Sequence, residues 1–65
     1  MKDLSEVLEM IKRESKFIDI KPHSHNIVGL GLQILQDEFN YTDEMIVKVV
    51  LENGLHKKGW GYLNQ

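Results

Sequence analysis

The chain contains no cysteine, so disulfide bonds cannot stabilise it and thiolate ligands for a structural metal are missing. It has 65 residues, and at this length the apolar surface buried on folding barely offsets the conformational entropy that is lost. The remaining means of stabilisation are close helix packing, a bound partner chain or self-association. We therefore predict one small domain spanning residues 1–65 and expect a homo-oligomer.

Long hydrophobic runs are also missing. No stretch approaches the roughly 20 consecutive apolar residues that a membrane-spanning helix needs. The first residues, Met1 to Glu6, lack the apolar core of a signal peptide. We therefore expect a cytoplasmic protein without a membrane partner.

Positive charge is in slight deficit, with eight Lys and Arg against ten Asp and Glu and a formal net charge of −2. Nucleic-acid binding depends on cations that contact phosphates, so this balance disfavours nucleic acid as a partner without excluding it. Arg13 is the only arginine, and arginine is the side chain best suited to a guanine edge. A basic patch of Lys12, Arg13, Lys16 and Lys21 stays open as an alternative to an ordinary solvated face.

Pro22 and the pair Asn40 and Tyr41 separate three segments in which apolar residues recur at the spacing of a helix face. The predicted helices span residues 3–18, 24–39 and 43–53. The third segment is rich in β-branched residues, so a buried strand is the alternative there. The predicted fold class is all-α, a small three-helix domain that we expect to be stabilised by oligomerisation.

The ends of these helices carry recognisable capping residues. Asp3 and Glu6 resemble a capping box, Ser24 is the predicted N-cap of the second helix, and Thr42 is that of the third. Gly54 is expected to take the left-handed conformation that stops the third helix.

The second helix has two apolar rows, so we expect it to be central and to touch neighbours on two sides. Gly29 and Gly31 within it predict the close approach of another helix, with a kink or a ligand-contacting backbone as the alternative. Truncation of Leu30 or Ile34 to alanine is expected to cost about 2–5 kcal/mol. The predicted core consists of Leu8, Ile11, Ile27, Leu30, Ile34, Leu35, Phe39, Ile46, Val49 and Val50, closed at one end by Leu55 and Trp60.

The side chains that could support catalysis are few and are explained by other roles. Hydroxyl groups lie at helix starts, where they act as caps, and no nucleophile motif is present. Adjacent carboxylates such as Asp37 and Glu38 point to different faces of a helix. We therefore predict no enzymatic activity and no cofactor.

Three histidines, His23, His25 and His56, suggest a zinc site only if the C-terminal segment folds back. A fourth ligand such as Asp37 or Glu38 would then be needed. We predict no metal site and keep a metal-linked domain as an alternative.

The C-terminal segment 56–65 carries an aromatic cluster flanked by glycines. Trp60, Tyr62 and Leu63 follow Lys57 and Lys58, and Trp and Tyr are favoured interface anchors. These five residues are the predicted partner-binding residues. The equally open alternative is that Trp60 closes the small core.

The string Pro22-His23-Ser24-His25-Asn26-Ile27-Val28, with Asn53-Gly54-Leu55 and Gly59-Trp60 further on, resembles a pattern in short, mostly uncharacterised bacteriophage-encoded helical proteins. The resemblance covers about the C-terminal two-thirds of the chain, and His23 stands where that pattern has an aromatic residue. No functional residue can be transferred, because the pattern carries no established activity. It does imply a setting, since small phage proteins commonly bind a host protein in the host cytoplasm.

These observations predict a small protein-binding module, an inhibitor or adaptor of phage type that acts stoichiometrically on a host protein. The alternative is a small nucleic-acid-binding transcriptional regulator that uses basic residues of the first helix and the C-terminal segment. Those residues are Lys12, Arg13, Lys16, Lys57 and Lys58.

Overall fold

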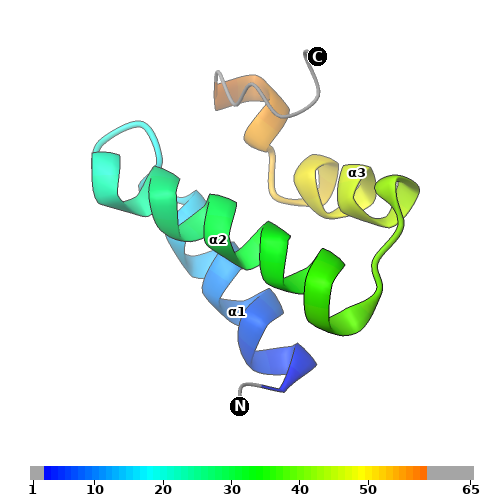
Figure 1. The fold of residues 1–65 in the computed structure, drawn as a ribbon. Coiled ribbons are helices and arrows are strands. Elements are labelled where there is room, and N and C mark those ends of the chain that lie inside the picture. Colours follow the sequence, from blue (N-terminus) through cyan, green and yellow to red (C-terminus); the bar gives the residue numbers. More distant parts are fainter. Residues whose placement is uncertain (1–2, 59–65) are drawn as a thin grey trace.

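A computed structural model describes residues 3–58, which form three α-helices and a short 3₁₀-helix (Figure 1). The elements are α1 (Leu4–Ser15), α2 (Pro22–Phe39), α3 (Asp43–Glu52) and η1 (Leu55–Lys58). Within residues 3–58 there is no strand, so the all-α prediction is confirmed and the strand alternative for the third segment is wrong.

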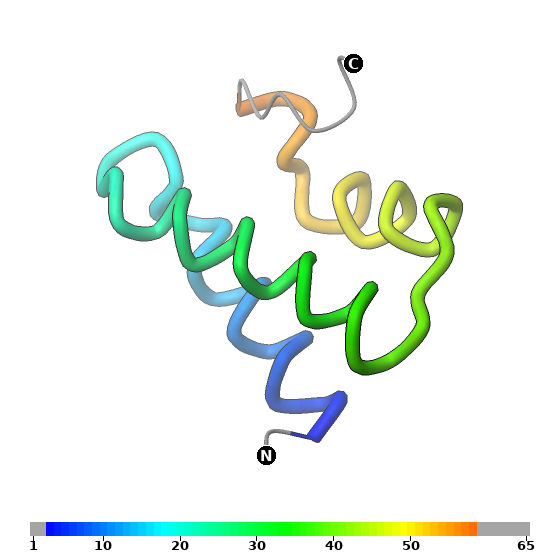
Figure 2. Tube along the Cα trace, in the orientation of Figure 1, coloured from blue at the N-terminus to red at the C-terminus, as the bar shows by residue number. Residues whose placement is uncertain are grey.

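The two longest helices, α1 and α2, pack along each other and run in opposite directions (Figure 2). After α2 the chain turns back into α3, and η1 follows at the end of α3. No helix within the described range is both long enough and apolar enough to cross a membrane.

Helix α1 begins with the predicted capping box. The Asp3 carboxylate accepts a hydrogen bond from the Glu6 backbone N–H at 3.0 Å, and the Glu6 carboxylate accepts one from the Asp3 N–H at 3.2 Å. The helix ends at Ser15, three residues before the predicted boundary, because the chain then tightens into turns around Phe17. Ile18 lies beyond the helix but is still buried.

Helix α2 begins at Pro22, two residues earlier than predicted, with Lys21 as its N-cap. Proline suits this first position because its missing N–H would have no partner within the helix. The prediction that Ser24 is the N-cap is therefore wrong. Ser24 lies inside α2, is 1% exposed, and donates a hydrogen bond from its hydroxyl to Glu14 of α1 at 2.8 Å.

The boundaries of α3 follow the sequence signals closely. The Thr42 hydroxyl accepts a hydrogen bond from the Met45 backbone N–H at 3.3 Å. At the other end Gly54 has a φ of +68°, the left-handed conformation that was predicted. The next residue, Leu55, is fully buried in the core.

The core lies between the three helices, and its composition corrects part of the predicted set. Leu30 is 56% exposed, because α2 turns its other apolar row inward. Ile27, Leu8, Ile34 and Phe39 are only partly buried. Trp60 lies outside the described residues. The buried apolar residues are Val7, Ile11, Ile18, Val28, Leu32, Leu35, Ile46, Val49, Val50 and Leu55.

Gly31 lies where α2 packs tightly against α1. A Cβ atom at this position would be 2.7 Å from Cγ1 of Ile11 and 3.1 Å from Cε of Met10. These distances are too short for a normal carbon–carbon contact. The prediction that a glycine in this helix permits close approach of another helix is therefore confirmed at Gly31.

Candidate functional site

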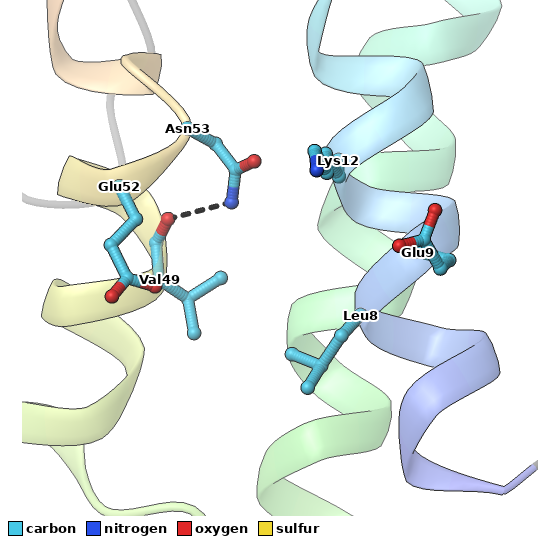
Figure 3. Close-up of a pocket in the computed structure, with 6 residues that line it drawn as sticks. All are labelled: Leu8, Glu9, Lys12, Val49, Glu52 and Asn53. Atoms are coloured by element: carbon cyan, nitrogen blue, oxygen red, sulfur yellow. Dashed lines mark hydrogen bonds between the residues drawn. The ribbon is translucent and has the colours of Figure 1, made fainter.

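A groove lies between α1 and α3 (Figure 3). One part of the groove has a volume of about 320 Å³ and an adjoining part about 270 Å³. The two parts share Leu8, Val49 and Glu52, so they form one continuous depression. The α1–α3 groove is lined by Leu8, Glu9, Lys12, Tyr41, Met45, Lys48, Val49, Glu52 and Asn53.

Helical spacing explains why these residues share the groove. Leu8 and Lys12 are four residues apart in α1, and Met45 and Val49 are four apart in α3, so each pair lies on one face of its helix. Figure 3 shows the side chains of Leu8 and Val49 extending toward each other across the gap between the helices. These apolar side chains form the inner surface of the groove.

The edges of the groove carry charges of both signs. Glu9 and Lys12 lie on the α1 side, and Lys48 and Glu52 lie on the α3 side. All four residues are exposed. The groove therefore combines an apolar interior with a charged rim, as protein interfaces commonly do.

One end of the groove is fixed by Asn53, which follows α3. Its side-chain Nδ2 donates a hydrogen bond to the backbone carbonyl of Val49 at 2.9 Å (Figure 3). The same carbonyl also accepts a hydrogen bond from the Asn53 backbone N–H at 3.2 Å, so the side chain adds a second bond at the end of α3. The hydrogen bond therefore holds the Asn53 side chain in place at the C-terminal end of the α3 wall.

The predicted partner-binding residues fall into two groups. Trp60, Tyr62 and Leu63 lie outside the described residues. Lys57 is exposed in η1. The ammonium group of Lys58 donates a hydrogen bond to the backbone carbonyl of Ser15 at 3.1 Å, which holds η1 against the end of α1.

The histidines do not come together with other potential ligands. Over residues 3–58 there is no group of three or more His, Cys, Asp or Glu side chains that could hold a metal ion. His23 and His25 lie in the first turns of α2, and His56 lies in η1. The arrangement in this range offers no support for the zinc alternative.

Two carboxylates have shifted acidities. The Ser24 hydroxyl, aided by the Arg13 guanidinium at 3.4 Å, lowers the pKa of Glu14 below its ordinary value. The backbone N–H of Glu6 and the Ser5 hydroxyl lower the pKa of Asp3 in the same way. Both groups therefore stay ionised at neutral pH and serve as hydrogen-bond acceptors that hold the helices in place.

The α1–α3 groove was not predicted from the sequence. Leu8 and Val49 were predicted to lie in the core, whereas Leu8 is only partly buried and both border the groove. The available signal was the pairing of charged with apolar residues on the same helix faces, such as Lys12 with Leu8 and Lys48 with Met45. That signal identifies the amphipathic face of a helix, but not which other helix lies beside that face.

The chain was compared with protein-family models, with curated proteins and with solved structures. None of the three comparisons found a match.

Proposed function

We propose that the protein is a small protein-binding module, an inhibitor or adaptor of phage type that acts stoichiometrically on a host protein. The observation that carries this proposal is the α1–α3 groove, which has an apolar interior and a rim with charges of both signs. Binding, and not catalysis, is the activity that such a surface performs.

The occupant that best fits the groove is an amphipathic helix of the partner protein. Two helices form its walls, and a third helix can place an apolar row between them. Met45 is 42% exposed at the edge and offers apolar surface that such a helix would cover. Charges of both signs on the rim, such as Lys48 and Glu52, would pair with complementary charges on the partner and fix its register.

The aromatic residues of the C-terminal segment belong to the same proposal. Trp60 and Tyr62 are of the residue types that most often contribute large shares of binding energy. Lys57, Lys58 and Leu63 complete the second contact region. Replacement of Trp60 with alanine is expected to weaken partner binding without unfolding residues 3–58.

The decisive experiment compares two variants of α3. Met45→Glu places a charge on the groove, whereas Leu51→Glu places the same charge at a site that is 50% exposed and does not line the groove. Each tagged chain is used to recover its partner, which is identified by mass and then titrated against the purified chain. We expect one-to-one binding that Met45→Glu weakens at least about tenfold and Leu51→Glu leaves within about twofold.

Circular dichroism melting of both variants controls for folding. If the identified partner binds the folded Met45→Glu variant as tightly as the original chain, the groove is not its binding site. If no partner binds at a defined stoichiometry, the proposal of a stoichiometric inhibitor or adaptor is wrong.

We also propose that the chain forms a homo-oligomer, as its small size suggests. Leu30 is 56% exposed on α2 and lies in one row with the partly buried Ile27 and Ile34. Light scattering at several protein concentrations tests this proposal. A mass that stays at that of a single chain, 7.6 kDa, would contradict it.

A further inference from the structure

The positive charges of the chain are concentrated at one end of the fold. Six of the eight Lys and Arg residues occur in the last turns of α1, in the connection to α2 and in η1. We call this region the basic end. It consists of Lys12, Arg13, Lys16, Lys21, Lys57 and Lys58.

One hydrogen bond joins two of these segments, and a second contact lies within the α1–α2 connection. The Lys58 ammonium donates to the Ser15 carbonyl at 3.1 Å, which joins η1 to the end of α1 across 43 positions of the sequence. Lys21 lies over the Phe17 ring, with its nitrogen 4.8 Å from the ring centre. In Figure 1 the α1–α2 connection and η1 both lie in the upper part of the molecule, and the start of α1 lies at the bottom.

The negative charges gather elsewhere. The start of α1 lies beside the end of α2 because the two helices are antiparallel, and α3 begins immediately after α2. These helix ends carry Asp3, Glu6, Asp37, Glu38, Asp43 and Glu44. The formal net charge of −2 therefore averages over two ends of opposite sign.

Few carboxylates neutralise the basic end. Glu14 and Asp19 are the acidic residues within its segments, and Glu14 already accepts hydrogen bonds from Ser24 and Arg13. Lys12, Lys16 and Lys57 are exposed. Cations near a helix C-terminus are favourable in any protein, which accounts for those of α1. That effect does not account for the exposed Lys57 in η1.

We propose that the basic end binds the phosphate backbone of a nucleic acid, a second activity beside that of the α1–α3 groove, with which the basic end shares Lys12. Lysine binds backbone phosphates as a point charge, whereas the reading of base edges favours the forked arginine side chain. The end has one arginine, and its Nε already contacts Glu14 at 3.4 Å. Binding is therefore independent of base sequence and falls as salt rises.

The test measures binding of the full chain to short labelled DNA duplexes of two unrelated sequences by fluorescence anisotropy. We expect similar affinity for both sequences and a steep loss between about 50 mM and about 200 mM salt. Each contacted phosphate contributes about −0.9 to the slope of log affinity against log salt, so three or four contacts predict a slope of about −3 to −4.

Matched variants separate the basic end from net charge alone. Lys16→Gln and Gln33→Glu each change the net charge by the same amount, and both residues are exposed, but Gln33 lies in the middle of α2. We expect Lys16→Gln and Lys57→Gln each to weaken binding roughly five- to tenfold at 0.1 M salt and to reduce the slope by about one. Gln33→Glu should change the affinity less than about twofold.

Poly-glutamate serves as the competing polyanion. The proposal is wrong if poly-glutamate displaces the duplex as effectively as unlabelled DNA of equal charge, since the partner would then be an acidic protein surface. It is also wrong if the duplex does not bind at about 50 mM salt, or if Lys16→Gln and Gln33→Glu weaken binding equally. These measurements need no protein partner, and Lys16, Lys57 and Gln33 do not line the groove, so their outcome is distinguishable from that of the groove experiment.

Discussion

The two sides of α1 differ in how closely a neighbouring helix approaches. Toward α2 the packing is so close that a Cβ atom added at Gly31 would be 2.7 Å from Cγ1 of Ile11. On the other side Leu8 and Val49 line a groove between α1 and α3. The contact of α1 with α2 is therefore closed, whereas its boundary with α3 keeps apolar surface, such as the partly buried Leu8, that a partner can cover.

The largest expected effect tests which row of α2 belongs to the core. Leu32 is 1% exposed, so Leu32→Ala should lower the free energy of unfolding by about 2–5 kcal/mol. Leu30 is the same residue type on the same helix but is 56% exposed, so Leu30→Ala should cost less than about 1 kcal/mol. Urea unfolding measures both values. Equal costs would contradict the observed orientation of α2.

The next effect tests the close packing of α1 on α2 directly. Gly31→Ala gains about 1 kcal/mol of helix propensity. The added Cβ meets Cγ1 of Ile11, an atom near the backbone that cannot easily move away, and such overpacking costs about 1–3 kcal/mol. We expect a net loss of about 1 kcal/mol in urea unfolding, with the exposed Gln33→Ala as control. Net stabilisation by Gly31→Ala would mean that α1 and α2 move apart easily enough to accommodate the added Cβ.

The smallest effect concerns the hydrogen bond that joins the same two helices. The pKa of Glu14 is lower in the folded chain than its ordinary value of 4.5, so the bond from Ser24 adds stability above pH 4.5. That stability is lost as the pH falls through the folded pKa of Glu14. Glu14→Gln should therefore show a shallower decrease of melting temperature between neutral pH and pH 3 than the original chain.

Glu9→Gln removes an exposed carboxylate from the same helix and serves as the control for this pH series. Ser24→Ala should reproduce the shallower pH dependence, because it removes the donor of the same hydrogen bond. If Glu14→Gln and Glu9→Gln give the same pH profile, the Ser24–Glu14 bond contributes no measurable acid sensitivity.

The three helices and most of their ends could be predicted, because the residues that determine them are close together in the sequence. Asp3, Thr42 and Gly54 act on backbone groups within a few residues, and all three behave as the sequence indicates. Ser24 was misread because proline at position 22 can itself open a helix, which left the serine hydroxyl available for Glu14. These two signals for a helix start, Pro22 and Ser24, lie only two residues apart.

The orientation of α2 could not be predicted, because both of its rows are apolar and only the packed neighbours decide between them. Val28 and Leu32 are buried where Leu30 was expected. The α1–α3 groove was missed for a related reason, because it joins residues far apart in the chain. The residues of the basic end were named from the sequence, but the contact that joins η1 to the end of α1 was not, since net charge does not show where charges meet.

The hydrogen bond between Lys58 and the Ser15 carbonyl has a consequence for the order of folding. Contacts between nearby parts of a chain form sooner than contacts that close a long loop. The pairing of α1 with α2 closes a short connection, whereas Lys58 must find a partner 43 residues away. The docking of η1 is therefore expected to be a late step in folding. In a chain in which only α1 and α2 have paired, the lysines of η1 have not yet joined those of α1, so the basic end is incomplete.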